Sequence, residues 1–277
     1  MKGQDSNAVK EFYERTAEEY DKDYERPYWK LYHEITWNNI KQFLPKRKNA
    51  VILDAGGGTG YWAIRLAKRG YRVVLTDISR NMLKVAHRKI ESEGLQGEIE
   101  TRIVDIRNMN CFPSDSFDMA IAQGDPVSYC LNAEKAVREL ARVVKADAHV
   151  VASVDSKYNM IHQVLIPNAI EERFSKQALD KMSLFLRTGF LRTDYEFQAF
   201  TPEELKALFE TCGLRVLRII GKPVLTQFIP REKRDEIVGN HFRSVLKLEL
   251  NLCDVPSLVG IGGHLEIVGV KQGVRKH

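Results

Sequence analysis

Residues 51–79 read VILDAGGGTGYWAIRLAKRGYRVVLTDIS, and this stretch decides the fold. The apolar start, residues 51–53, predicts a short buried strand, and the apolar run 71–75 predicts a second strand that finishes at Asp77. Between them a glycine-rich turn leads into a helix that ends at Gly70. Glycine takes positive φ and lets a ligand approach the backbone closely, so the turn is expected to hold a ligand.

The spacing of the glycines favours a nucleoside without a phosphate at the turn. The run DAGGGTG, residues 54–60, lacks the Lys-Ser/Thr ending of a nucleoside-triphosphate loop. It also lacks the G-x-G-x-x-G spacing that places a pyrophosphate on a helix N-terminus. Asp77 falls where the second strand of a Rossmann-like unit presents a carboxylate to ribose hydroxyls.

The same stretch resembles the first motif of the class I S-adenosylmethionine (SAM) dependent methyltransferases. That motif is D/E-x-G-x-G-x-G after an apolar strand, and it is matched here by Asp54, Gly56, Gly58 and Gly60. The resemblance implies SAM as cofactor and S-adenosylhomocysteine as product. It also implies that these four residues, with Asp77 and the adjoining Ile78, bind the cofactor.

The resemblance extends over nearly the whole chain. Strand 101–104 ends in Asp105 and Ile106, which look like the acid that accepts from the adenine amino group and the residue that packs on the ring. Residues 117–125 look like the fourth strand entering the active site, with Gln123 beside the cofactor. Residues 12–21, FYERTAEEYD, are similar to the opening of the ubiquinone and menaquinone C-methyltransferase group, in which the residue matching Tyr20 faces the cofactor.

Alternating strands and helices predict one α/β domain with a doubly wound sheet and helices on both faces. The resemblance supplies seven strands in the order 3-2-1-4-5-7-6, with the last strand antiparallel. We expect a single domain over residues 1–277, a length that suits one large α/β unit. Its expected parts are a helical cap at 1–45, helical over 8–44, a SAM-binding core at 46–156, an inserted acceptor lid at 157–200, and the rest of the core at 201–277, with one helix over 231–252.

The loop after the fourth strand, QGDPVSY at residues 123–129, is the expected catalytic segment. Methyltransferases of exocyclic amines use [N/D/S]-P-P-[Y/F/W], in which the polar side chain accepts amine hydrogens and the aromatic ring stacks on the base. Asp125 and Pro126 match its first half, but Val127 replaces the second proline and Tyr129 comes one residue late. The sequence therefore predicts Asp125, Pro126 and Tyr129 as catalytic residues and an amine acceptor such as the exocyclic amine of cytidine in RNA.

The distribution of charge leaves the acceptor open. Residues 46–89 contain eleven Lys and Arg against Asp54 and Asp77, although the formal net charge of the whole chain is only +5. If the helices of this segment share one side, these cations form a basic face that could follow an RNA backbone. The alternatives are a solvated surface with a small-molecule N-, O- or C-acceptor, and a SAM-binding partner protein without transferase activity.

Composition excludes several other classes. No apolar stretch approaches the ~20 residues that a bilayer span needs, and the polar start lacks a signal sequence, so we expect a cytoplasmic protein without membrane contact. Cys111, Cys130, Cys212 and Cys253 are scattered without ligand spacing, which predicts neither a metal site nor disulfides. Spacing distinguishes no histidine as a general base; His33, His162, His241 and His264 are all candidates.

Overall fold

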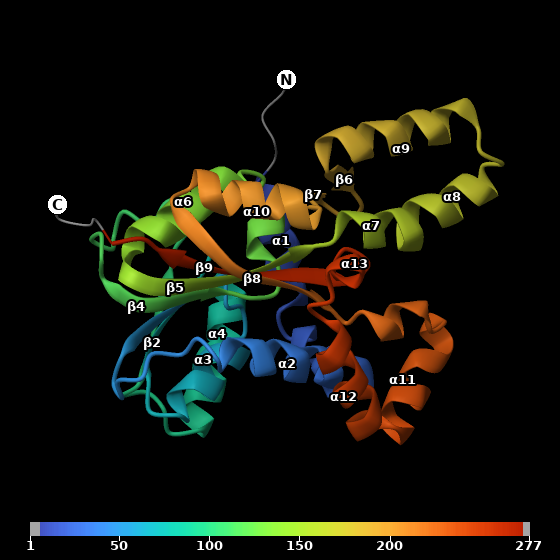
Figure 1. Ribbon diagram of the computed structural model, residues 1–277. Coiled ribbons are helices and arrows are strands. Elements are labelled where there is room, and N and C mark those ends of the chain that lie inside the picture. Colours follow the sequence, from blue (N-terminus) through green and yellow to red (C-terminus); the bar gives the residue numbers. More distant parts are fainter. Residues whose placement is uncertain (1–5, 274–277) are drawn as a thin grey trace.

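A seven-stranded sheet forms the centre of the protein in the computed structural model, which describes residues 6–273 (Figure 1). Its strands lie in the order β3-β2-β1-β4-β5-β9-β8. They are β1 (Val51–Ala55), β2 (Arg72–Asp77), β3 (Ile99–Ile103), β4 (Phe117–Ala122), β5 (Val144–Asp155), β8 (Leu214–Lys222) and β9 (His264–Lys271). The first five strands run parallel, and β9 pairs antiparallel with both β5 and β8. The predicted order is confirmed, with β8 and β9 as the expected sixth and seventh strands.

Helices cover both faces of the sheet, because its strands are apolar on both sides. On one face lie α6 (Ala133–Val143) and α10 (Pro202–Thr211), and on the other α3 (Tyr61–Ala67) and α4 (Arg80–Ser92). Each face has its own core: Val137, Leu140 and Phe209 belong to the first, and Trp62, Leu66 and Ile90 to the second. Because β1 to β5 run parallel, their carboxyl ends lie at one edge of the sheet, where the loops after β1, β2, β4 and β5 meet.

The N-terminal segment is three pieces rather than the continuous helix expected over 8–44. These are α1 (Ser6–Thr16), the 3-10 turn η1 (Tyr20–Glu25) and α2 (Pro27–Ile40). Pro27 explains the break, because proline disfavours helical backbone at the preceding residue and is well placed at the first turn of a new helix. Arg26 accordingly has extended backbone, with ψ of 142°. The break lets α1 and η1 fold over the strand ends while α2 packs beside the sheet.

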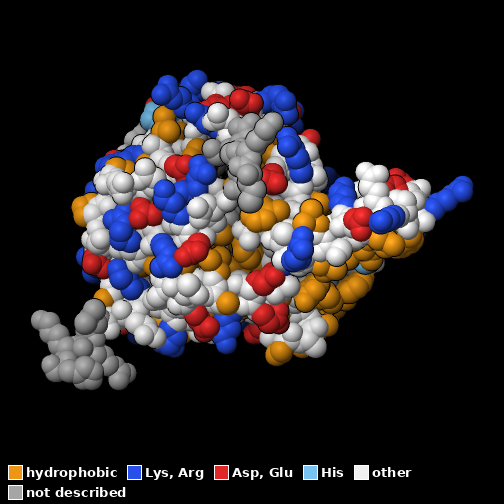
Figure 2. Space-filling view, turned by 90° about the horizontal axis from the view of Figure 1, so that it is seen from above, with side chains coloured by type: hydrophobic (Ala, Val, Ile, Leu, Met, Phe, Trp, Pro, Cys, Tyr) orange, Lys and Arg blue, Asp and Glu red, His pale blue; other side chains and the backbone are white. Residues whose placement is uncertain are grey.

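The inserted segment forms an arm. Its elements are α7 (Lys157–Met160), the π-helical turn η2 (Ile161–Leu165), α8 (Ile166–Glu171), α9 (Lys176–Thr188) and the hairpin β6 (Phe190–Arg192) and β7 (Glu196–Gln198). Figure 1 shows α8 and α9 projecting from the body, and Figure 2 shows apolar side chains along this projection. The base of the arm is packed around Phe185, Leu191 and Phe197. Only the base lies near the strand ends, so the role of the segment as an acceptor lid stays a prediction.

The C-terminal insertion before β9 packs against α2. It contains η3 (Leu225–Phe228), α11 (Arg231–Asn240), α12 (Phe242–Leu252) and α13 (Pro256–Val259). The single helix expected over 231–252 is interrupted at His241, where φ is −127°. Leu31 and Ile35 of α2 share a buried cluster with Val238 and Val245. Within residues 6–273, none of the helices is both long and apolar enough to cross a membrane.

Candidate cofactor and acceptor site

In the glycine turn after β1, only Gly58 has open space where a side chain would be, and the other glycines are closely packed. Gly58 has φ of +55°, and a Cβ added there would meet only Met82 Cε, at 3.9 Å. A Cβ on Gly56 would lie 2.6 Å from Pro126 Cβ, and one on Gly57 would lie 2.5 Å from Asp54 Oδ2. Gly60, at φ +81°, starts α3 in left-handed backbone. Gly58 therefore provides the open side of the turn, and Gly57, an unassigned position of the sequence motif, is also required to be glycine.

Two buried carboxylates support the turn. Asp77 Oδ2 accepts from Gly58 N at 3.0 Å and its Oδ1 accepts from Ser79 N at 2.8 Å. Burial raises the pKa of Asp77 to about 6, against the opposing effect of these backbone donors. Burial likewise raises the pKa of Asp54, which is fully buried, to about 7. Asp77 thus joins the end of β2 to the turn and lines the cavity beside it.

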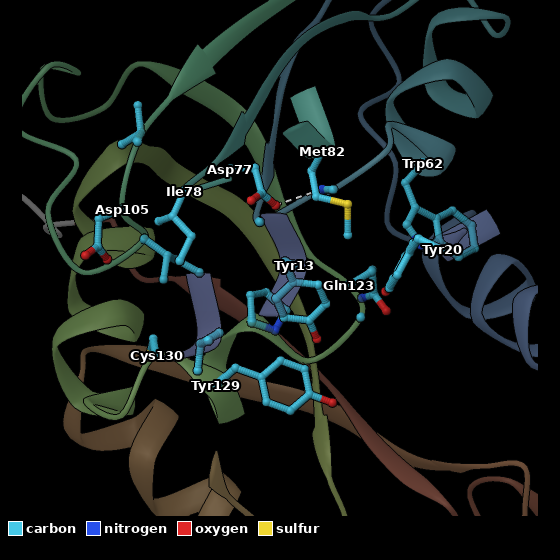
Figure 3. Close-up of a pocket in the computed structure, with 18 of the residues that line it drawn as sticks. Tyr13, Tyr20, Trp62, Asp77, Ile78, Met82, Asp105, Gln123, Tyr129 and Cys130 are labelled. Atoms are coloured by element: carbon cyan, nitrogen blue, oxygen red, sulfur yellow. Dashed lines mark hydrogen bonds between the residues drawn. The ribbon is translucent and has the colours of Figure 1, made fainter. Parts of the chain in front are cut away.

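The cofactor cavity lies over this turn and is lined from five parts of the chain. Figure 3 shows Asp105 and Ile78 toward one end and Tyr20 with Gln123 toward the other. Of the residues predicted to bind SAM, those that line it are Tyr20, Gly56, Gly58, Asp77, Ile78, Asp105, Ile106 and Gln123. Asp54 and Gly60 lie beneath the turn instead and shape it. The cavity contains a Cβ-free cradle and a strand-end carboxylate, so its residues fit a nucleoside cofactor such as SAM.

Two of the lining side chains are held by partners that the sequence did not indicate. Asp105 forms an ion pair with Arg107, with 2.6 Å between Oδ2 and Nη2. Burial opposes ionisation of Asp105, but Arg107 outweighs it and lowers the pKa of this carboxyl. Gln123 accepts from the buried Lys222 Nζ at 2.9 Å, and Lys222 is itself paired with Glu266. The Gln123 amide is thus oriented from below by a buried ion pair.

A second cavity, the acceptor chamber, continues from the first. The two share Tyr13, Tyr20, Tyr24, Trp62, Gly124 and Tyr129. The chamber is bounded by α1, η1, α2 and the short helix α5 (Pro126–Tyr129). Its aromatic side chains are Phe12, Tyr13, Tyr20, Tyr24, Trp29, Tyr32, Trp62 and Tyr129. Tyr195, from the base of the arm, extends this cluster, since its hydroxyl lies 3.2 Å from that of Tyr13.

Three polar side chains meet at the floor of the chamber. His264, at the start of β9, places Nδ1 2.7 Å from Asp125 Oδ2 and 3.9 Å from Asp155 Oδ1. Burial opposes ionisation of both Asp125 and His264, but the attraction between the two charged groups outweighs burial. The pKa of Asp125 is therefore lowered and that of His264 is raised. Burial and the Asp125 charge raise the pKa of Asp155 to about 7. The arrangement can accept and hold a proton.

These three residues also form a possible metal site, although the sequence predicted none. One ligand atom from each of Asp125, Asp155 and His264 can be chosen so that all lie within 4.8 Å of one another. Within the described part of the chain, Asp125 Oδ1 and His264 Nδ1 have no hydrogen-bond partner, although Nδ1 lies 2.7 Å from Asp125 Oδ2. The same three groups can share a proton or hold a metal ion.

The predicted catalytic residues are brought to the chamber by an unusual turn. Asp125 has φ of +64°, and its N–H, like that of Gly124, donates to Ser153 Oγ at 3.1 Å. Pro126 lines the cofactor cavity rather than the chamber, and Tyr129 lines both. Asp155 was missed as a site residue, and His264 was one of four undistinguished histidine candidates, because they lie at the end of β5 and the start of β9, far along the chain. The only available signal was that β5 ends at Asp155 and the last strand begins at His264.

The predicted basic face is partly neutralised by the N-terminal segment and its neighbours. Of the eleven Lys and Arg between residues 46 and 89, five form ion pairs within the described part of the chain, namely Arg47, Arg65, Lys68, Arg88 and Lys89. Glu18, Asp21 and Glu34 of the cap supply three of the carboxylates. Of these pairs, the less exposed Arg65–Glu34 and Lys89–Asp21 attach the cap to the core.

Comparison with known proteins agrees with the geometry. Residues 52–147 match the methyltransferase domain family. The chain is 31% identical over 144 residues to a ubiquinone/menaquinone biosynthesis C-methyltransferase of Hydrogenovibrio crunogenus, covering 49% of this chain and 52% of that one. It is 24% identical to the tRNA 5-carboxymethoxyuridine methyltransferase of Escherichia coli, covering 86% and 87%.

Solved structures share the fold. Geranyl diphosphate C-methyltransferase of Streptomyces coelicolor, solved with Mg²⁺, geranyl diphosphate and S-adenosylhomocysteine, superposes with a TM-score of 0.55 at 12% identity, covering 86% of this chain and 79% of that one. The fold and the glycine-turn cavity define a methyltransferase domain of the Rossmann-like type. Residues 52–147 thus form a methyltransferase domain, and the likeness to named methyltransferases supports SAM as its methyl donor. It spans a little over half the length of the first relatives it matches.

Proposed function

We propose that the protein transfers the methyl group of SAM to the nitrogen of a small, positively charged amine. The observation that carries this proposal is the lining of the acceptor chamber. Among the described residues, eight aromatic rings and the carboxylates of Glu19, Asp23 and Asp125 line it, and neither Lys nor Arg does. Aromatic faces attract cations, and buried carboxylates favour them further.

The histidines of the chamber do not reverse this charge. Burial lowers the pKa of His33 to about 3, so its ring is neutral at pH 7. His264 lies against Asp125, and any positive charge it gains is matched by that carboxylate. Glu19 and Asp23 are at the exposed rim, where Lys22 and Arg26 pair with them. The negative charge available to a buried acceptor is therefore that of Asp125.

A protonated amine has no lone pair, so the protein must remove a proton before the methyl group can be accepted. When bound, SAM supplies a methyl group on a sulfonium, an electrophile that reacts with a neutral nitrogen. Since His264 Nδ1 lies 2.7 Å from Asp125 Oδ2, we assign Nε2 as the ring nitrogen that takes the proton. Asp125 then stabilises the imidazolium. The surrounding rings exclude water and orient the amine, which is the larger part of catalysis in such displacements.

Methylation of an RNA base is the second candidate, and it is supported by the tRNA methyltransferase relative, which covers most of this chain. Against it stand the acidic, aromatic chamber and the ion-paired cations of the predicted basic face. The cytoplasmic location expected from the sequence stays a prediction.

The deciding experiment supplies methyl-labelled SAM with total RNA and, separately, with a small-metabolite extract. We expect label in amines of the metabolite pool, identified by mass spectrometry. Label only in RNA nucleosides would favour the second candidate. Label in neither pool, with SAM still bound, would favour the partner protein without transferase activity.

A further inference from the structure

A second pocket, here called the side pocket, adjoins the acceptor chamber and is lined by residues of α2, α7, η3 and α11. It shares Asp23, Trp29 and His264 with the chamber. A molecule whose amine lies beside His264 can therefore extend into the side pocket without crossing the protein core. The charges of the side chains that line this pocket therefore indicate which chemical group the rest of the acceptor contains.

Arg234 of α11 lines the side pocket and is buried, with 8% of its surface exposed. Its Nη2 donates to the carbonyl oxygens of Gln227 and Ile229 at 3.4 and 3.2 Å, and its Nε has no partner. Its guanidinium lies 4.8 Å from the centre of the Tyr28 ring. Among residues 6–273, no carboxylate forms an ion pair with it. A buried cation without a counter-charge is costly, which is why such groups are ordinarily paired.

The carboxylates around Arg234 are already engaged elsewhere. Asp235 pairs with Arg26, at 2.7 Å between Oδ2 and Nη2, and Asp23 pairs with the same guanidinium. The buried Glu249 accepts from the backbone of Val224 and Thr226. The exposed Arg231 adds a second cation to the same pocket. The side pocket therefore has unpaired positive charge, in contrast to the chamber beside it.

We infer that the side pocket binds a carboxylate of the acceptor, so that the substrate is a zwitterionic amino acid with its amine in the chamber and its carboxylate on Arg234. This inference rests on the proposed amine methylation. A planar guanidinium matches a carboxylate, and the Tyr28 hydroxyl, which accepts from Gln227, retains its own hydrogen to donate. The two pockets thus place opposite charges at the two ends of one small molecule.

The test begins with the products labelled in the small-metabolite extract. Each labelled product is treated with acidic methanol, and esterified carboxyl groups are counted by mass spectrometry. We expect every major labelled amine to carry a carboxyl group. Labelled amines without one, or with a phosphate or sulfate in its place, would overturn the inference while leaving amine methylation intact. The absence of any labelled amine would instead remove the proposed function and, with it, this inference.

The identified acceptor is then used with two variants. Arg234→Gln removes the buried charge, and Arg243→Gln removes an exposed charge from the neighbouring α12 as the matched control. We expect Arg234→Gln to raise KM by about 10-fold or more with a smaller effect on kcat, because a charge-assisted hydrogen bond to the substrate is lost. The KM of Arg234→Lys, which keeps the charge, should lie between that of the unmodified protein and that of Arg234→Gln. Melting curves establish that each variant is folded. An unchanged KM in folded Arg234→Gln would overturn the inference.

Discussion

Gly58 is the residue on which cofactor binding depends most directly, because its missing side chain is the open face of the turn. Replacing it with leucine should abolish SAM binding, measured by isothermal titration calorimetry. Gly94 is the matched control, since it also has positive φ, +69°, but nothing lies within 4 Å of an added Cβ. Gly58→Leu and Gly94→Leu each incur about 1 kcal/mol of backbone strain, but only Gly58→Leu fills the cavity. Retained SAM affinity in Gly58→Leu would contradict the cofactor assignment.

The contact between Asp125 and His264 predicts the pH dependence of turnover. His264 must be neutral to take a proton, and Asp125 raises its pKa, so activity should fall as the pH drops through that raised pKa. Asp125→Asn removes the charge and should move the acidic limb of kcat to lower pH, with a lower kcat at the optimum. Profiles of both proteins at saturating SAM measure this. A limb that stays in place would show that another group titrates.

At the scale of the element, the N-terminal cap is attached to the core through Asp21. Its Oδ1 accepts from Thr59 Oγ1 at 2.6 Å and its Oδ2 pairs with Lys89 at 2.7 Å. Asp21→Ala should loosen α1 and η1 over the cavity and weaken SAM binding about 5- to 30-fold, as expected for the loss of about 1–2 kcal/mol. Glu18→Ala is the control, because its pair with Arg88 is exposed on both sides and contributes little. Equal SAM affinities in the two variants would show that attachment of the cap through Asp21 does not contribute to SAM binding.

Elements were predictable where a local pattern determines them. The apolar strands, the glycine turn and the N-cap at Ser79 depend on neighbouring residues, and they form as expected. The floor of the chamber depends on tertiary structure, because Asp125, Asp155 and His264 follow or begin three different strands. The family resemblance places the last strand beside β5, but no spacing in the sequence indicates that His264 then lies against Asp125. The chamber's aromatic wall was only partly predictable, since Tyr20 matches a family pattern whereas Trp29 and Tyr32 look like ordinary core residues of a helix.

At the scale of the whole molecule, the proposed small acceptor predicts weak salt dependence. A protein that neutralises six to ten phosphates loses about 10³- to 10⁵-fold in affinity between 50 and 200 mM salt. With a small acceptor held in the chamber, as proposed, this protein should keep KM for the acceptor within about 3-fold over that range. Steady-state kinetics at the two salt concentrations measure this. A steep loss of apparent affinity for the acceptor with salt would instead support RNA binding by the basic face, residues 46–89.

Counting charges along the chain leaves the acceptor open between a small amine and RNA. Sequence counts cations along the chain, whereas a ligand meets them in space, where Glu18, Asp21 and Glu34 approach from the N-terminal segment. The chamber and the side pocket carry opposite charge characters within one surface. Only the folded arrangement separates them.

The close approach of Gly56 to Pro126 has a consequence for how this domain can be recombined. A single added methyl group at position 56 would lie 2.6 Å from the proline ring, so the turn after β1 and the loop after β4 fit each other through an absent side chain. A chimera that takes the first segment from one relative and the second from another inherits two halves that were never matched. The pair must be inherited together, and crossover points for shuffling this domain belong before residue 56 or after residue 126.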